Sequence, residues 1–205
     1  MRLGGFEPFT ASDFPGRLAA IVFSQGCNFR CPFCHNGTLL GPRPAADLVR
    51  CRDFFAFLER RQGLLSGVVV SGGEPTLQEG LAGFCRRLKE MGFAVKLDTN
   101  GSRPQVIYDL IEAQLLDYIA MDIKAPLDRY DLLAGRAGAG GQIKSAIALI
   151  AQSGLPHHFR TTHVRSLLSA EDLQAVQELV PPGSMHRLQP FIAAAALDPA
   201  LRHGR

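Results

Sequence analysis

Residues 67–101 read GVVVSGGEPTLQEGLAGFCRRLKEMGFAVKLDTNG, a stretch in which two short apolar runs flank a helical pattern. The runs Gly67–Val70 and Phe93–Leu97 are bounded by Gly, Ser, Asp and Asn, which predicts two buried strands. Between them, apolar residues recur every three or four positions from Leu77 to Met91, as they do on one face of a helix. Buried strands joined by such a helix favour parallel pairing through a crossover connection.

The rest of the chain repeats this alternation of strand and helix. The other predicted strands are Leu18–Phe23, Asp117–Ile123, His158–Val164 and Met185–Ile192, and the other predicted helices are Asp47–Arg61, Pro104–Gln114, Gln142–Gln152 and Ser169–Val180. This pattern predicts an α/β protein, a single-domain, partial (β/α)6 TIM-like barrel of parallel strands over residues 1–205. We expect residues 1–17 to form an N-terminal lead-in, Ala134–Gly141 to form a mobile loop, and residues 198–205 to form a flexible C-terminal tail.

Composition and charge limit the class of protein. With 46% hydrophobic residues, 20% charged residues and a net charge of +3, the sequence is typical of a folded protein without a clustered basic surface for nucleic acid. Residues 1–5 lack the pattern of a secretory signal, and no apolar run approaches the ~18 residues of a membrane helix. We therefore expect a cytoplasmic protein that binds neither nucleic acid nor membrane. Cys51 and Cys85 fall on the apolar faces of predicted helices, where we expect them to pack as small hydrophobic residues.

Three cysteines, Cys27, Cys31 and Cys34, lie within eight residues after the first predicted strand. In a cytoplasmic chain such crowding indicates metal binding or catalysis before it indicates cross-linking. A structural zinc ion has four protein ligands, and His35, as the immediate neighbour of Cys34, is poorly placed to reach the same metal. A [4Fe-4S] cluster held by three cysteines instead leaves one iron open to an exogenous ligand. The alternatives are three small buried cysteines or an incomplete zinc site.

Polar residues also lie at the ends of the next three predicted strands, in Ser71–Glu74, in Asp98–Asn100 and in the pair Asp122 and Lys124. Because the carboxyl ends of parallel strands meet at one edge of a sheet, a single site at that edge would explain all these positions. Asp122 and Lys124 are two residues apart and face the same side of a strand, where opposite charges are costly unless paired or bound to a ligand. An ion pair that serves only the structure is the alternative.

These motifs resemble a known family. The sequence CNFRCPFC at Cys27–Cys34 resembles the signature of the radical S-adenosylmethionine superfamily, and Gly72–Pro75 resembles its second motif. The further segments Asp13–Gly16, His35–Asn36, Asp98–Gly101 and Met121–Lys124 resemble activating enzymes of glycyl-radical enzymes, particularly the activator of anaerobic ribonucleoside-triphosphate reductase. The resemblance extends from about Gly4 to Phe191.

The resemblance implies two cofactors, a [4Fe-4S] cluster held by Cys27, Cys31 and Cys34, and S-adenosylmethionine, with no catalytic residue beyond them. The residues implied to bind S-adenosylmethionine are Phe33, His35, Asn36, Gly72, Gly73, Glu74, Asp98, Thr99, Asn100, Asp122, Lys124 and Arg160. The two glycines would let the backbone approach the methionine amino group, which Glu74 would help to neutralise. The Asp98–Asn100 turn would contact the ribose and amino acid portions, and Arg160 the carboxylate. The segment 33–36 would shape the adenine pocket.

The implied activity is abstraction of a hydrogen atom from one glycine of a partner glycyl-radical enzyme, with anaerobic ribonucleotide reductase as the expected partner and a flavodoxin or ferredoxin-type protein as reductant. Pyruvate formate-lyase is an alternative partner, although its activators carry a histidine soon after a Pro-aromatic pair where this chain has Pro190-Phe191-Ile192. A small-molecule enzyme resembling 7-carboxy-7-deazaguanine synthase is a second alternative. A zinc or electron-transfer module without catalytic activity is a third.

Overall fold

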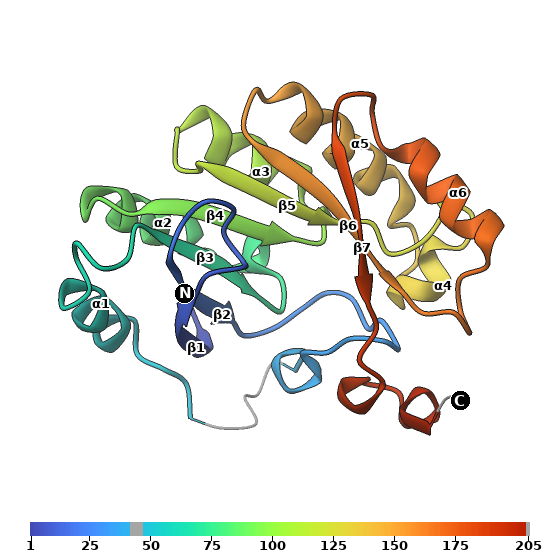
Figure 1. Cartoon of the computed structure of the whole chain (residues 1–205), viewed down its shortest axis with the longest axis horizontal. Coiled ribbons are helices and arrows are strands. Elements are labelled where there is room, and N and C mark those ends of the chain that lie inside the picture. Colours follow the sequence, from blue (N-terminus) through green and yellow to red (C-terminus); the bar gives the residue numbers. More distant parts are fainter. Residues whose placement is uncertain (42–46, 204–205) are drawn as a thin grey trace.

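The computed structural model describes residues 1–41 and 47–203, and its main feature is one seven-stranded sheet. The strands lie side by side in chain order: β1 Leu3–Thr10, β2 Ala19–Ser24, β3 Gly67–Gly72, β4 Ala94–Thr99, β5 Tyr118–Asp122, β6 His157–His163 and β7 Met185–Pro190. β1 is antiparallel to β2, and every later neighbour is parallel. Within the described residues β1 and β7 form the two edges of the sheet, so the predicted partial barrel of six parallel strands is confirmed (Figure 1).

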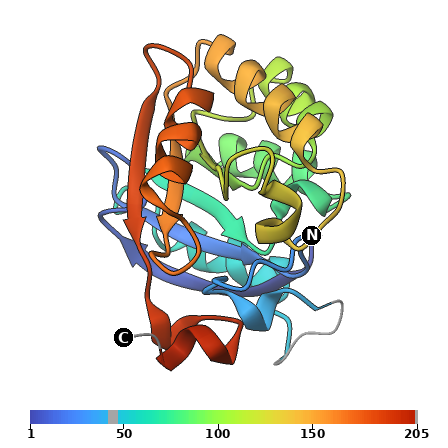
Figure 2. The ribbon, with the colours of Figure 1, turned by 90° about the vertical axis from the view of Figure 1, so that its right-hand side faces the viewer.

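In the described part of the chain, six α-helices connect the strands and lie around the outside of the curved sheet (Figures 1 and 2). They are α1 Cys51–Glu59, α2 Leu81–Glu90, α3 Pro104–Glu112, α4 Tyr130–Ala134, α5 Gly140–Gln152 and α6 Ala170–Leu179. Helix α6 begins with a capping box, in which Asp172 N donates to Ser169 Oγ over 3.2 Å and Ser169 N donates to the Asp172 carboxylate over 2.9 Å. Pro104 is at the start of α3, where its missing N–H costs nothing.

The two faces of the parallel strands have different roles, because side chains alternate between them. Outward residues such as Val68 and Val70 pack against the helices in the main hydrophobic core, with Cys85 fully buried among them. On the inner face, Phe14 packs with Val69 and two alanines in a smaller apolar cluster, away from the strand ends that carry the polar motifs. The part of the inner face at the carboxyl ends of the strands carries polar residues.

Strand β1 was not predicted from the sequence, which placed Leu3–Thr10 in a lead-in. Gly4, Gly5 and Pro8 interrupt the alternation that marks a strand, and the pairing with β2 contains register shifts. The strand forms because it pairs with the otherwise free edge of β2. This pairing is not encoded in the local sequence.

Some helix boundaries also differ from the prediction. Helix α1 begins at Cys51 and not at Asp47, because Val49 is held in extended conformation by a backbone hydrogen bond to Leu3. The mobile loop predicted at Ala134–Gly141 is reduced to the few residues between α4 and α5, and the Asp131 carboxylate accepts hydrogen bonds from two of their backbone amides.

The predicted flexible tail at 198–205 includes a short 3-10 helix, Pro199–His203, and its last two residues lie outside the described part of the chain. Among residues 1–41 and 47–203, no helix is both long and apolar enough to cross a membrane.

Candidate functional site

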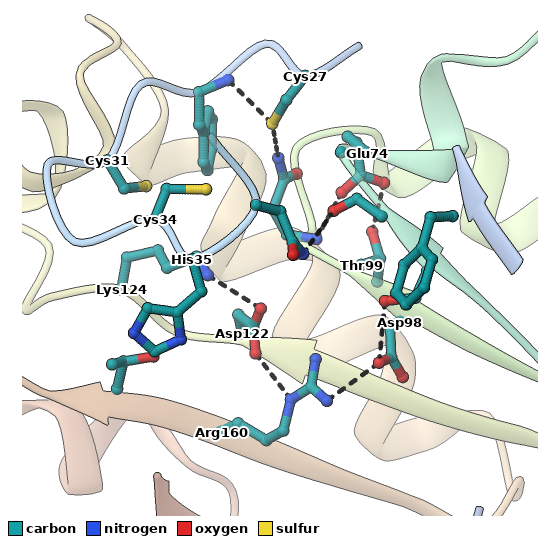
Figure 3. Close-up of a pocket in the computed structure, with 18 of the residues that line it drawn as sticks. Cys27, Cys31, Cys34, His35, Glu74, Asp98, Thr99, Asp122, Lys124 and Arg160 are labelled. Carbon is teal, nitrogen blue, oxygen red and sulfur yellow. Dashed lines mark hydrogen bonds and ion pairs between the residues drawn. The ribbon is translucent and has the colours of Figure 1, made fainter. Parts of the chain in front are cut away.

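The three clustered cysteines lie on the loop that follows β2, above the carboxyl ends of the parallel strands (Figure 3). Backbone hydrogen bonds hold this loop in place: Gly26 N donates to Leu39 O over 2.6 Å, and Arg30 N donates to Ala134 O at the end of α4 over 2.8 Å. Cys27, Cys31 and Cys34 all line one cavity of about 380 Å³, which is within the size range of small-molecule sites.

Two of the three thiols are buried enough to resist ionisation. Burial raises the pKa of Cys27 to about 11 and that of Cys31 to about 12, while the nearby Lys124 ammonium acts in the opposite direction. A metal centre must therefore displace the thiol protons when it binds. In the described residues, no three Cys, His, Asp or Glu side chains are grouped around a point as for a single metal ion. Three thiol ligands on one loop at a shared cavity nevertheless fit an iron–sulfur cluster by the chemistry of the donor set.

The Gly72-Gly73 turn at the end of β3 packs directly against the start of the cysteine loop. A Cβ atom on Gly73 would lie 2.1 Å from Gly26 O, and one on Gly72, whose φ is +113°, would lie 2.3 Å from Ser24 N. Glu74 N donates to Gly26 O over 2.9 Å, which joins the two segments. The glycines are therefore required by the packing of the chain on itself, in addition to any approach to a ligand.

Glu74 is buried and is already surrounded by hydrogen-bond donors from the protein. Its carboxylate accepts from Thr76 N over 3.0 Å and from the Thr76 hydroxyl, from Thr99 Oγ1 over 2.8 Å and from Asn100 N over 2.7 Å. Burial raises the pKa of Glu74, and these bonds oppose that effect. The side chain therefore ties the end of β3 to the end of β4.

Two aspartates and three cations form a connected network on the inner face. Arg160 Nε donates to Asp122 Oδ1 over 2.8 Å and its Nη1 donates to Asp98 Oδ2 over 3.1 Å, while Lys124 Nζ donates to Asp122 Oδ2 over 2.9 Å (Figure 3). Lys96, almost fully buried, pairs with Asp98 from below. Burial alone would raise both aspartate pKa values, but the neighbouring cations hold them below the usual range.

The network contains the ion pair that was the structural alternative to ligand binding. Asp122 and Lys124 do form an ion pair, and both residues also line the cavity. Because the cationic side chains outnumber the carboxylates they face, the network can accept a further anionic group.

His35 and Asn36 connect the cysteine loop to other elements at the mouth of the cavity. His35 Nε2 accepts a 3.2 Å hydrogen bond from Ile192 N, and its ring stacks on Phe191 with centroids 5.7 Å apart. Burial and the Lys124 charge lower the pKa of His35, so the ring is neutral and able to accept. Asn36 Nδ2 donates to Gly72 O over 3.3 Å, and Phe33 is buried beside them.

The fifteen residues predicted for the cluster and the cofactor all line this one cavity. Sequence reasoning missed four further lining residues from the inner face, Ile21, Phe23, Thr162 and Gln189. Their signal was the period of two along each strand, since Thr162 follows Arg160 by two positions and Ile21 and Phe23 are likewise two apart.

The fold and the site together define an open α/β barrel with a three-cysteine loop beside a small-molecule pocket, a donor set that suits an iron–sulfur cluster. Residues 21–180 match the family profile described as the Radical SAM superfamily. The chain belongs to the radical S-adenosylmethionine superfamily, and its cofactors are a [4Fe-4S] cluster and S-adenosylmethionine.

Curated relatives are similar over most of the chain. A Methanocaldococcus jannaschii protein, named as a candidate glycyl-radical enzyme activating enzyme, is 32% identical over 96% of this chain and 82% of its own length. The pyruvate formate-lyase-activating enzyme of Streptococcus mutans is 30% identical over 85% of this chain and 70% of its own length. Both alignments extend well beyond the cysteine motif.

Solved structures share the fold at low sequence identity. Streptococcus suis SuiB bound to its precursor peptide SuiA has a TM-score of 0.67 and 14% identity, covering 85% of this chain and 39% of that one. The enzyme anSMEcpe with bound AdoMet has a TM-score of 0.60 and 16% identity, covering 82% of this chain and 50% of that one. This chain thus spans half or less of the length of these structures.

Proposed function

We propose that this chain activates a glycyl-radical enzyme by removing a hydrogen atom from one glycine of that partner. The main support is the similarity to the Methanocaldococcus jannaschii protein, which extends over 96% of the chain. When bound, the cluster and S-adenosylmethionine would supply the chemistry, which is one-electron reductive cleavage of the sulfonium bond to methionine and a 5′-deoxyadenosyl radical able to take the hydrogen atom. The electron comes from a flavodoxin or ferredoxin-type reductant.

In this proposal different residues of the cavity bind different parts of the two cofactors. Cys27, Cys31 and Cys34 hold the cluster, and the cationic side of the inner network, Lys124 and Arg160, faces the carboxylate of the methionine portion. Asp98 and Asp122 keep these cations in position and offer acceptors to the ribose hydroxyl groups.

The remaining cavity residues shape the pocket more than they carry charge. Phe33, His35 and Asn36 surround the adenine. The turn of Gly72 and Gly73 lies beside the methionine amino group, and Glu74 and Thr99 fix the position of that turn through their mutual hydrogen bond. We also propose that residues 1–205 act as one domain.

The expected partner is anaerobic ribonucleotide reductase, which rests on the resemblance of His35-Asn36, Asp98–Gly101 and Met121–Lys124 to the activators of that enzyme. Pyruvate formate-lyase is the second candidate, favoured by the Streptococcus mutans relative. A 7-carboxy-7-deazaguanine synthase of Thermococcus kodakarensis is 30% identical, but over only 53% of this chain, which supports a small-molecule substrate less well.

The experiment has two stages. The anaerobically reconstituted protein, given dithionite and S-adenosylmethionine, is expected to form 5′-deoxyadenosine, and the Cys31→Ala variant is expected to form none. The protein is then incubated with purified anaerobic ribonucleotide reductase or, in parallel, with pyruvate formate-lyase, and each mixture is examined by electron paramagnetic resonance. A glycyl doublet in the mixture with the reductase, but not in the mixture with pyruvate formate-lyase, supports the proposed partner. Cofactor cleavage without a doublet in either mixture contradicts the proposed activity on these enzymes.

A further inference from the structure

A chain of polar residues ends at the sulfur of Cys27, on the side of the cavity away from the aspartates. We propose that the side-chain amide of Asn100 donates a hydrogen bond to Cys27 Sγ and so raises the reduction potential of the cluster that Cys27 helps to hold. This inference depends on the cluster of the superfamily and not on the partner protein. It gives Asn100 a role different from the cofactor contact expected from the sequence.

Two N–H groups point at the Cys27 sulfur. Phe29 N lies 3.4 Å from Cys27 Sγ and Asn100 Nδ2 lies 3.8 Å from it, both within the range for a sulfur acceptor. Figure 3 shows these two contacts as dashed lines that meet at the sulfur. In the described part of the chain, Cys27 is the only one of the three clustered cysteines whose sulfur accepts a hydrogen bond.

The orientation of the Asn100 amide is fixed by its other neighbours. Ser102 N donates to Asn100 Oδ1 over 2.9 Å, and because a backbone N–H can only donate, the atom that faces it must be the oxygen. The nitrogen is thereby directed towards Cys27 and towards Asn28 Oδ1, which accepts from it over 3.0 Å. Asn28 Nδ2 donates in turn to Ser102 Oγ over 2.8 Å, and the Ser102 backbone N–H closes a ring of three residues.

Two of the three residues of this ring are nearly inaccessible to water, since Asn100 is 6% exposed and Ser102 is 5% exposed, and Asn28 is partly buried. Every polar atom of the Asn100 amide already has a partner within the protein, so the side chain is not free to turn towards a ligand. Such a closed network holds a donor at a constant distance from its acceptor.

A donor at a cluster sulfur stabilises the reduced state more than the oxidised state. Reduction adds an electron, part of whose negative charge falls on the thiolate ligands, and an N–H dipole directed at a sulfur favours that charge. The effect is strengthened by the low polarity of a buried site. Loss of the Asn100 donor should therefore make the cluster harder to reduce.

The test compares Asn100→Leu with Ser102→Ala, both reconstituted anaerobically and titrated without S-adenosylmethionine while the reduced cluster is followed by electron paramagnetic resonance. Asn100→Leu removes the donor while keeping the number and branching of the side-chain heavy atoms. Ser102→Ala removes the Asn28 contact but keeps both Ser102 N and the Asn100 amide. Iron and sulfide content is measured for each protein, so that cluster loading is separated from cluster potential. Asn100→Ser, whose hydroxyl is too short to reach the sulfur, replaces Asn100→Leu if that variant does not fold.

We expect the reduction potential of the cluster in the Asn100 variant to become more negative by up to about 59 mV. For a one-electron couple this shift makes the ratio of reduced to oxidised cluster tenfold smaller. The reduction potential of the cluster in Ser102→Ala should match that in the wild-type protein. An unchanged potential in a fully loaded Asn100 variant would overturn the inference, as would an equal shift in Ser102→Ala, which would indicate general loosening of the loop. Because neither S-adenosylmethionine nor a partner is present, these outcomes are independent of the proposed activation reaction.

Discussion

Arg160 and Asp122 lie opposite each other on the neighbouring strands β6 and β5, and Arg160 Nε donates a 2.8 Å hydrogen bond to Asp122 Oδ1. The other side of the same guanidinium reaches Asp98 on β4. One planar cation thus joins carboxylates from two other strands across the inner face of the barrel, which a lysine ammonium has neither the reach nor the shape to do. The relationship makes Arg160 a structural residue, and contact with the carboxylate of S-adenosylmethionine would be a second, proposed role.

Replacing Arg160 with alanine should affect stability and cofactor binding together. Two largely buried carboxylates lose a partner, which should lower the free energy of unfolding by about 3 kcal/mol, as for other broken buried pairs. The affinity for S-adenosylmethionine should fall at least about tenfold if Arg160 faces its carboxylate. Denaturant unfolding and equilibrium dialysis measure the two effects. Lys89→Gln, which breaks the more exposed pair with Asp117, is the control and should lower the free energy of unfolding by less than about 1 kcal/mol.

Glu74→Gln tests whether this side chain acts within the protein or on the ligand. A carboxamide turns an N–H₂ group towards donors from Thr76, Thr99 or Asn100, so we expect the apoprotein to lose about 1 to 3 kcal/mol of unfolding free energy. The exposed neighbour Glu79 provides the control, Glu79→Gln, with little change. If the apoprotein keeps wild-type stability and only the affinity for S-adenosylmethionine falls, the prediction of a structural role for Glu74 is wrong.

The sequence predicted the site better than it predicted the contacts within the site. Cys27, Gly73 and Asp122 could be assigned to one cavity because the ends of parallel strands meet at one edge, so local motifs after each strand are brought together by the fold. The contact of Asn100 with Asn28 spans 72 residues and depends on how two loops face each other, which no local pattern encodes. The edge strand β1 was missed for the same reason, since it depends on a non-local pairing.

Two glycines, Gly73 and Gly83, should respond to alanine in opposite ways. On Gly73 the added Cβ lies 2.1 Å from Gly26 O, so the cysteine loop must move. We therefore expect the free energy of unfolding to fall by about 2 to 4 kcal/mol and the iron content to be lower. Gly83 lies on an exposed position of α2 with nothing within 4 Å of its added Cβ, so Gly83→Ala should stabilise by about 0.5 to 1 kcal/mol. Thermal unfolding with iron analysis measures both, and equal effects at the two positions would contradict the packing argument.

His158 should make the stability of the protein depend on pH in the weakly acidic range. Burial, with help from Lys96 and Arg160, lowers the pKa of His158 to about 4, and the Tyr118 hydroxyl lies 2.9 Å from its Nδ1. An unfolded histidine takes up a proton near pH 6.5, whereas the folded one stays neutral to about pH 4, so the unfolded state binds more protons between these values. The stabilisation is therefore fully present above about pH 6.5 and is lost progressively as the pH falls towards 4.

The measurement is the urea midpoint of the apoprotein at intervals from pH 7 to 4.5, a range that stays above the titration of Asp98 and Asp122, whose pKa values are lowered. His158→Phe keeps a ring in the same space but cannot take up a proton, so its midpoint should change less steeply over this range than that of the wild type. A variant that follows the wild-type curve would show that other groups cause the acid sensitivity.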